Sequence, residues 1–378
     1  MKPLDIETLL DDPKTKVIVC CGSGGVGKTT LAAALGVRAA ERGRSVVTLT
    51  IDPARRLAQS LGLKELDNVP RKVAGVKGDL HAMMLDMKRT FDEVVEAHTT
   101  PVKAAQILAN PFYQSLSSSF AGTQEYMAME KLGQLRASGR WDLIVVDTPP
   151  ARSALDFLDA PKRLGRFLDG RFIRMILIPA KAGGRGYARV VHAGLSLLTA
   201  TMTKLLGAQL LTDVQTFVAA MDTMFGGLRE RADATAALLR APGTAFVVVA
   251  APEPDALREA SYFVDRLVEE KMPLAGVVVN RMQQSAAPRI SASQAAAAAD
   301  ALDELAGNDA RLTAGLLRVH AERMSMQATE KKRVDGFSLA HPNVQLASVR
   351  AFARDVHDLA ALRELGAAVC QPAQPTAE

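Results

Sequence analysis

Residues 22–30 read Gly22-Ser23-Gly24-Gly25-Val26-Gly27-Lys28-Thr29-Thr30. The spacing matches G-x-x-x-x-G-K-[ST], the pattern of a phosphate-binding loop. An apolar run of β type, residues 16–21, precedes the loop, and a helix-forming run, residues 31–35, follows it. In this context the glycines let backbone N–H groups and the helix N-terminus surround an anion. The sequence therefore predicts a nucleotide-binding site, and a glycine-rich turn without a ligand is the alternative.

Two side chains of the loop have specific predicted roles. We expect the Lys28 ammonium to reach the β- and γ-phosphates of ATP as a catalytic group, and the Thr29 hydroxyl to bind Mg²⁺. The whole stretch 22–30, with Ser23 and Thr30 included, is expected to line the nucleotide. ATP and Mg²⁺ are therefore the predicted cofactors.

The composition narrows the class of protein. The chain has 378 residues, of which 48% are hydrophobic and 4% aromatic, so Ala and Leu do most of the packing and favour helix. No apolar stretch reaches membrane-spanning length, and the first residues do not resemble a signal peptide. Cys20, Cys21 and Cys370 have no metal-binding spacing and suit a reducing compartment, so we expect a cytoplasmic protein. The net charge of +5 permits an acidic partner without requiring one.

Apolar runs of β type alternate with helix-forming runs along the chain. The later ones cover residues 44–51, 142–146, 245–250 and 273–279. Near-continuous apolar strands separated by helices predict a parallel sheet covered on both faces. The expected fold class is therefore α/β, a doubly wound, mostly parallel sheet with an inserted α-helical subdomain.

Two stretches without strand signals interrupt this alternation. We expect a nucleotide-binding domain made of 1–98, 121–160 and 241–369, a helical insertion made of 99–120 and 161–240, and a disordered tail, 370–378.

The basic segment 161–189 is either a solvated helix face or a surface for an acidic partner or lipid headgroups. The methionine clusters (Met83, Met84 and Met87; Met127 and Met129; Met202, Met221 and Met224) are either core or an adaptable groove. The Ala-rich stretch 284–306 is predicted to be a helix with a loose start.

Polar residues follow the predicted strands, where ligands of α/β sheets bind. Asp147 ends one apolar strand and is predicted to hold Mg²⁺ through water. Asp52 ends the strand after the loop and is the candidate to orient or deprotonate the attacking water. The alternative for Asp147 is that it caps a turn, and the alternative for Asp52 is that it caps the N-terminus of a helix. For Asp52, capping and the role at the attacking water are compatible.

The loop resembles the "deviant" Walker A motif Gly-Lys-Gly-Gly-Val-Gly-Lys-Thr of the ArsA/MinD/ParA class of dimeric ATPases. In that class the first lysine reaches across the dimer interface to the partner's nucleotide. Here Ser23 stands at that position, so the chain keeps the cis lysine, Lys28, and lacks the trans lysine. An uncharged hydroxyl cannot replace the stabilisation that a lysine gives to the charge of a transferring phosphate.

Further segments resemble the ArsA/GET ATPases in particular, in the actinobacterial type of subunit that lacks the signature lysine. Residues 52–57 resemble the first switch of that family, 122–125 its Gly-x-x-Glu segment, and 147–150 its second switch. Asn280, after Val277–Val279, matches the asparagine that contacts adenine. The resemblance implies a dimeric ATPase whose second switch passes the nucleotide state to a helical insertion, which binds a hydrophobic or membrane-protein client.

Other positions depart from the family. Ala151-Arg152-Ser153-Ala154 stands where the family has Thr-Gly-His-Thr, and Arg152 is either an exposed side chain or a source of cis positive charge. The Cys-x-x-Cys of the family's dimer zinc site is absent after Asn280, and no cysteine lies between Cys21 and Cys370. We therefore expect neither a zinc site nor an arsenite site.

Three functions remain open from the sequence. The first is a dimeric switch ATPase that works as one subunit of a heterodimer, with a lysine-bearing paralogous subunit as partner. The second is a catalytically weak, nucleotide-gated regulatory subunit. The third is a MinD/ParA-like positioning ATPase, although the mild net charge and few aromatics argue against nucleic acid. We expect the first, because Lys28, Thr29, Asp52 and Asp147 are all present.

Overall fold

The computed structural model describes residues 2–52, 56–111, 113–114, 117, 123–149, 227, 230–231, 233–285, 287–305 and 307–371. The expectations for Arg152, for the basic segment 161–189, for Met202, Met221 and Met224, and for most of the tail lie outside these residues. The chain divides into two compact units. One comprises Met1–Met84, Gly139–Leu155 and Leu239–Glu378, and the other Leu85–Ser138 and Asp156–Leu238.

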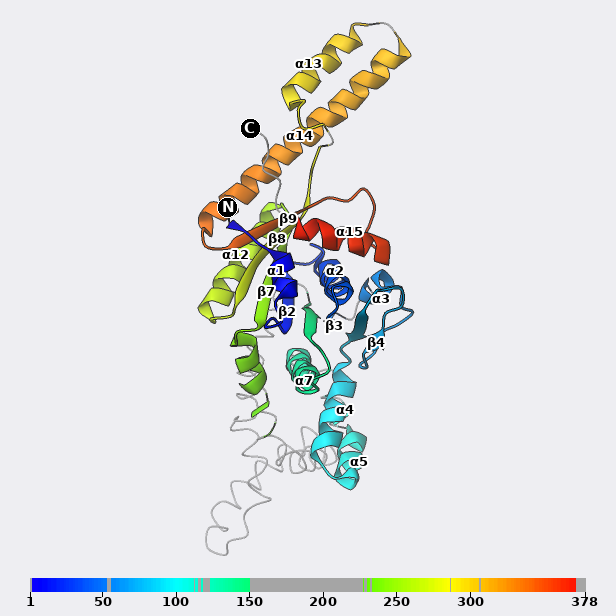
Figure 1. Cartoon of the computed structure of the whole chain (residues 1–378), viewed down its shortest axis with the longest axis vertical. Helices are drawn as coiled ribbons and strands as arrows, with labels where there is room; N and C mark the ends of the chain where they lie inside the picture. The colour runs from blue at the N-terminus through cyan, green and yellow to red at the C-terminus, as the bar shows by residue number, and fades with distance from the viewer. Residues whose placement is uncertain are drawn as a thin grey trace, which may run out of the picture. The chain divides into compact units, whose positions relative to one another are not determined.

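The first unit is built on a nine-stranded sheet in the order β1-β9-β8-β7-β2-β6-β3-β5-β4 (Figure 1). All neighbouring strands are parallel except β4 and β5. The strands are β1 Lys2–Pro3, β2 Val17–Gly22, β3 Ser45–Thr50, β4 Arg71–Lys72, β5 Asp79–Met84, β6 Leu143–Asp147, β7 Thr244–Ala250, β8 Leu274–Met282 and β9 Gln345–Arg350. The predicted α/β class with a mostly parallel sheet is confirmed.

Helices cover the central strands, which are buried along their whole length, as β2 and β6 illustrate. On one face, Ile18 and Cys20 of β2 pack in a single apolar cluster with α2 (Lys28–Glu41) and α15 (Leu359–Cys370). In Figure 1 these two helices lie side by side. Helix α12 (Pro254–Glu269) packs on β7, β2 and β8. Two short helices, α1 (Ile6–Asp11) and α3 (Arg56–Ser60), pack against α2.

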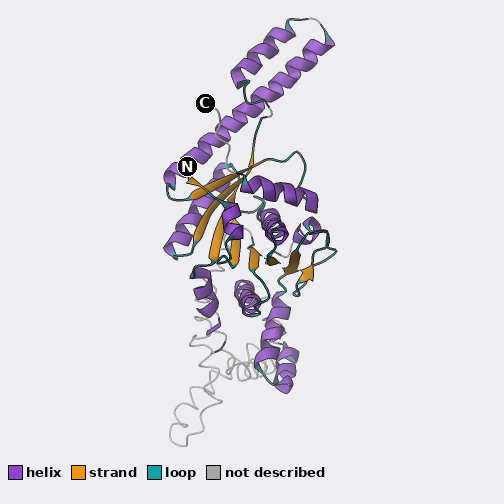
Figure 2. Ribbon diagram, viewed as in Figure 1, coloured by secondary structure: helices purple, strands orange, loops and turns teal. Residues whose placement is uncertain are grey.

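A helical hairpin follows β8. Helix α13 (Ala292–Asp303) begins with a capping box in which Ser291 and Gln294 satisfy each other's backbone, so this helix starts eight residues later than the predicted 284. Helix α14 (Asn308–Ala340) is 33 residues long and packs along α13 (Figure 2). The two helices pack together through small side chains, since Ala295, Ala299 and Ala314 are fully buried.

The described part of the second unit consists of helices. Helix α4 (Met87–His98) packs on α5 (Pro101–Ala109) and on α7 (Thr123–Ala137). Asp92 accepts hydrogen bonds from Tyr113 Oη at 2.5 Å and Lys88 Nζ at 2.7 Å, and Lys131 Nζ lies 2.6 Å from Glu93 Oε2. These contacts group α4 and α7 with this unit, which differs from the sequence-based assignment of 85–98 and 121–138 to the nucleotide-binding domain.

For three of the methionines in the described segments, the structure distinguishes core packing from an adaptable groove. Met83, Met127 and Met129 are each at most 1% exposed, so they pack inside their units. Burial of this kind is ordinary core packing, in which methionine fills irregular space.

A buried histidine gives the sheet a pH dependence. His81 on β5 packs against Trp141, and the Arg140 guanidinium lies 4.3 Å above the Trp141 ring and 3.2 Å from His81 Nε2. Burial is the main cause that lowers the pKa of His81, Asp79 opposes it, and Arg140 adds to it. Because the folded state holds the neutral imidazole, protonation favours unfolding.

We therefore expect the free energy of unfolding to fall as the pH drops below about 6.5, the ordinary pKa of the group. A His81→Gln variant should lose part of this fall, measured as urea unfolding near pH 7.5 and near pH 5.5. The exposed His357 supplies the matched control, since His357→Gln should keep the wild-type pH dependence. An unchanged pH dependence in His81→Gln would contradict the assignment.

Candidate functional site

The phosphate-binding loop joins the end of β2 to the start of α2. Gly22, Gly25 and Gly27 have φ angles of 142°, 77° and 97°, a range that side chains rarely tolerate. A Cβ added to Gly22 would also lie 2.1 Å from the carbonyl oxygen of Val249 on β7. Gly22, Gly25 and Gly27 are therefore required by backbone conformation, and Gly22 also by the close approach of the neighbouring strand.

Lys28 opens α2, and its side chain is turned onto the loop. Its Nζ donates a hydrogen bond of 2.7 Å to the carbonyl oxygen of Ser23, and the residue is only 7% exposed. Burial lowers the pKa of Lys28, and the attraction of Asp147 opposes that shift. The ammonium is thus held at the centre of the loop by a bond that a phosphate oxygen can replace.

Asp147 ends β6 between β2 and β3, and its side chain is completely buried. Its Oδ2 accepts hydrogen bonds from Thr29 Oγ1 at 2.8 Å and from Thr50 Oγ1 at 2.9 Å. Burial raises the pKa of Asp147 to about 6, although both threonines act in the opposite direction. Its Oδ1 has no hydrogen-bond partner among the described residues.

The Thr29 and Asp147 pair fits a magnesium ion. Mg²⁺ prefers oxygen ligands, and in nucleotide sites it is held by one or two protein groups together with phosphates and water. The buried and unpartnered Oδ1 of Asp147 leaves a free acceptor beside the Thr29 hydroxyl. Across the described ranges there is no cluster of three or more His, Cys, Asp or Glu side chains suited to a metal.

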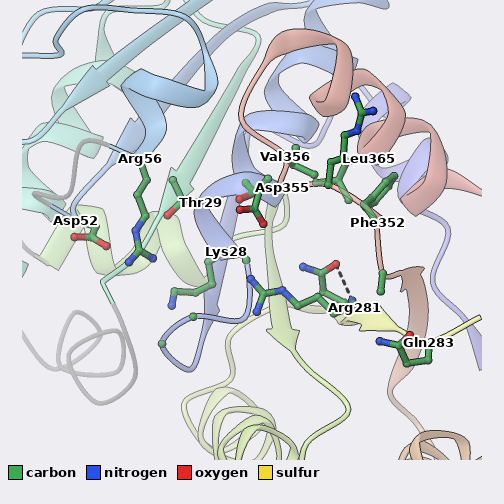
Figure 3. Close-up of a pocket in the computed structure, with 17 residues that line it drawn as sticks. Lys28, Thr29, Asp52, Arg56, Arg281, Gln283, Phe352, Asp355, Val356 and Leu365 are labelled. Atoms are coloured by element: carbon green, nitrogen blue, oxygen red, sulfur yellow. Dashed lines mark hydrogen bonds between the residues drawn. The ribbon is translucent and has the colours of Figure 1, made fainter. Parts of the chain in front are cut away.

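A cavity of about 760 Å³ opens beside the loop (Figure 3). It brings together the predicted site residues Lys28, Thr29, Asp52 and Asn280. The other lining residues are Gly24, Gly25, Gly27, Thr30, Arg56, Arg281, Gln283, Ala351, Phe352, Arg354, Asp355, Val356 and Leu365. Arg281, Gln283 and Leu365 were not predicted for this site, because they belong to no phosphate-loop pattern, whereas Arg56 lies in the segment 52–57 that resembles the first switch.

Asn280, near the end of β8, lies against the loop. Its Nδ2 donates to the carbonyl oxygen of Val26 at 2.9 Å, and its Oδ1 accepts from the backbone N–H of Arg281 at 2.9 Å. A Cβ on Gly27 would approach Asn280 Nδ2 to 2.4 Å. Asn280 therefore couples the end of β8 to the backbone of the loop.

Asp52 and Ser23 occupy different environments in this site. Asp52 is half-buried in the cavity wall, and its backbone N–H donates to Thr50 Oγ1 at 3.2 Å. Ser23 is 8% exposed, and its hydroxyl is buried without a hydrogen-bond partner in the part of the chain that the structure describes. Pro53, which follows Asp52, lies outside that part.

The strand–loop–helix geometry, with its lysine, threonine and buried carboxylate, defines a P-loop nucleotide-binding protein. A family model described as anion-transporting ATPase matches residues 15–304, more than three quarters of the chain. The chain belongs to this family, and the resemblance to ArsA/GET ATPases is confirmed.

Curated proteins of two kinds are similar to this chain. ATPase GET3 of Malassezia globosa is 32% identical over 169 residues, which cover 44% of this chain and 49% of that protein. A putative arsenical pump-driving ATPase of Prosthecochloris vibrioformis is 30% identical over 153 residues, 39% of this chain and 36% of that protein. ATPase get3 of Schizosaccharomyces japonicus is 26% identical over 283 residues, 74% and 78% of the two chains. With the first two, the match spans half or less of the relative's length.

Among the described residues, no helix combines the length and the apolar character that a membrane crossing needs. Helix α12 of the sheet unit is amphipathic, and α13 is rich in alanine.

The contact between Gly27 and Asn280 can be tested with a matched pair of variants. Gly27→Ala should reduce the free energy of unfolding by about 2–4 kcal/mol, because the new Cβ meets Asn280 and the positive φ is strained. Gly43 has a φ of 94° and open space around it, so Gly43→Ala carries the backbone strain alone and should cost about 1 kcal/mol. Urea unfolding without nucleotide measures both. Equal losses would show that the Asn280 contact adds nothing.

The charge of Asp147 is predicted to weaken the ligand-free fold. A pKa raised in the folded state means that ionisation opposes folding as the pH rises through about 6. Asp147→Asn keeps an acceptor for Thr29 and Thr50, so we expect it to raise the free energy of unfolding by about 1–3 kcal/mol near pH 7.5.

The gain should shrink near pH 5, and urea unfolding at both values measures it. Asp52→Asn is the control, because the half-buried Asp52 should change stability by less than about 0.5 kcal/mol. A loss of stability in Asp147→Asn would show that the attraction between Asp147 and Lys28 outweighs the cost of burial.

Proposed function

We propose that the chain is an ATPase of the ArsA/GET type that binds Mg-ATP in the cavity beside the loop. The observation that carries the proposal is the set of contacts at the loop, where Lys28 holds the Ser23 carbonyl and Thr29 donates to the buried Asp147. Membership of a family described as anion-transporting ATPases supports it. The names of the relatives, which include GET3 and an arsenical pump-driving ATPase, support ATP hydrolysis as the shared activity.

Different side chains of the site have different roles in the hydrolysis of ATP. The Lys28 ammonium exchanges the Ser23 carbonyl for β- and γ-phosphate oxygens, and residues 22–30 surround the phosphates with backbone N–H groups. Thr29 and, through water, Asp147 hold Mg²⁺, which neutralises phosphate charge when bound. Asp52 orients the water that attacks the γ-phosphorus and accepts its proton, while ADP leaves. Asn280 holds the base side of the nucleotide against the loop.

We further propose that the active form is a heterodimer with a lysine-bearing paralogous subunit. The cis groups Lys28, Thr29, Asp52 and Asp147 are complete, whereas position 23 offers only a hydroxyl that points into the protein. A lysine from the partner would add the positive charge that the transferring phosphate needs. In this arrangement the helical unit responds to the nucleotide state and binds a hydrophobic client.

The alternative is a regulatory subunit that binds ATP without productive hydrolysis. The specific observation in its favour is Ser23 itself, because a homodimer would lack the trans lysine at both sites. The two functions differ in whether the partner subunit raises the rate of ATP hydrolysis.

The experiment measures phosphate release from ATP by the chain alone, with the paralogue, and with a paralogue whose signature lysine is changed to Ala. We expect slow release by the chain alone, a rise of about 100-fold with the paralogue, and no rise with the altered paralogue. Lys28→Ala in this chain should weaken ATP binding by about 10-fold or more and abolish the rise.

The possible results test the heterodimer, the hydrolysis of ATP and the nucleotide site separately. Equal rates with and without the paralogue would refute the heterodimer, and ATP binding without turnover in every mixture would favour the regulatory subunit. Unchanged ATP affinity in Lys28→Ala would refute the site itself.

A further inference from the structure

We propose that Arg281 binds the phosphate chain of the nucleotide from the end of β8, as a second positive charge supplied in cis. The proposal rests on the proposed function and adds a residue that lies outside the phosphate-loop motif. It is carried by the backbone of Arg281, by the direction of its side chain, and by the lack of a partner for its guanidinium.

The backbone of Arg281 is unusual for a strand residue. Its φ angle is 63°, in the left-handed region, which L-residues with long side chains seldom adopt. The pairing of β8 with β9 changes register between Val279 and Met282, so Asn280 and Arg281 stand outside the regular ladder. Asn280 Oδ1 holds this conformation by accepting the Arg281 N–H at 2.9 Å.

The other non-glycine residue with a positive φ among the described residues is Lys271, and it has a local explanation. Lys271 follows the end of α12, where its N–H donates to the carbonyl oxygen of Val268 at 3.1 Å, an ordinary way to end a helix. Arg281 ends no helix. Strained backbone of this kind is concentrated at sites that position a group for function.

The register change turns the Arg281 side chain into the cavity. Figure 3 shows its guanidinium extended from β8 toward the phosphate loop, on the same side as Lys28. Asn280, the preceding residue, already contacts the loop at Val26. The chain therefore brings an arginine to the loop from a strand that lies far away in the sequence.

The guanidinium has no ion pair or hydrogen bond within the described ranges, and the residue is exposed. By contrast, the Lys28 ammonium is engaged with the Ser23 carbonyl. Other charged groups that line the cavity are Arg56 and Arg354, with Asp52 and Asp355 of opposite sign. Since arginine carries five donors in a planar fork that matches phosphate oxygens, free donors at this place fit a phosphate chain.

The test measures the binding of ATP, ADP and AMP to four variants of the full chain by calorimetry at fixed Mg²⁺. Arg281→Gln should weaken ATP and ADP binding by about 10-fold and AMP binding by less than about 3-fold. Arg281→Lys should recover part of the loss, because the charge remains and the fork is lost. Arg281→Gly should lose as much as Arg281→Gln although it relieves the backbone.

Lys271→Gly is the matched control, because it relieves the same kind of backbone conformation away from the cavity and should leave all three affinities within about 2-fold of wild type. The loss in Arg281→Gln should also diminish as salt is raised, since the contact is between charges.

Wild-type affinity for ATP in Arg281→Gln would overturn the proposal while leaving the proposed function intact. An equal loss for ATP, ADP and AMP would also overturn it, because Arg281 would then act on the loop or on Asn280 rather than on phosphate. Absence of ATP binding by the wild-type chain would refute the proposed function, and this inference with it.

Discussion

The site depends on one buried carboxylate. Asp147 lies at the meeting point of three elements, and it is hydrogen-bonded through Oδ2 to Thr29 at the start of α2 and to Thr50 at the end of β3. A buried ion is unfavourable unless it is bonded and balanced, so the two hydroxyls and the nearby Lys28 ammonium are needed together. The same groups that make the carboxylate tolerable also fix the helix start, the strand ends and the loop between them.

The remaining constraints are steric and act on the loop. Gly22 passes so close to the backbone of Val249 that a side chain is excluded, and a Cβ on Gly27 would lie 2.4 Å from the Nδ2 atom of the Asn280 side chain. Strands β7 and β8 therefore shape the loop from the side opposite to β6. The electrostatic contacts of the loop therefore come from β6, whereas its steric contacts come from β7 and β8. The cavity that Arg281 lines is on the side of the loop that β8 contacts.

The sequence predicted the parts of the structure that have strong local patterns. The loop, the α2 helix and the central strands follow from glycine spacing and from apolar runs, and Asp52, Lys28, Thr29 and Asn280 do line one cavity. Strands β1 and β4 have two exposed residues each, which leaves no periodic signal. The long helix α14 buries few apolar positions, so its pattern is weak beyond the Ala-rich start of the hairpin. The left-handed Arg281 arises from a register change, which depends on pairing with β9 and is invisible in single-chain patterns.

The strand order has a consequence for synthesis of the chain on the ribosome. The motif-bearing strand β2 is paired on one edge by β6 and on the other by β7, whose last residue is Ala250. At a synthesis rate of about 5–20 residues per second, the edge of β2 that pairs with β6 stays unpaired for roughly 6–25 s, and the edge that pairs with β7 for roughly 10–50 s. An unpaired, fully apolar strand is an aggregation hazard, so the nascent chain is exposed to aggregation until its second half arrives. The loop that is encoded first is therefore among the last parts of the protein to become a binding site.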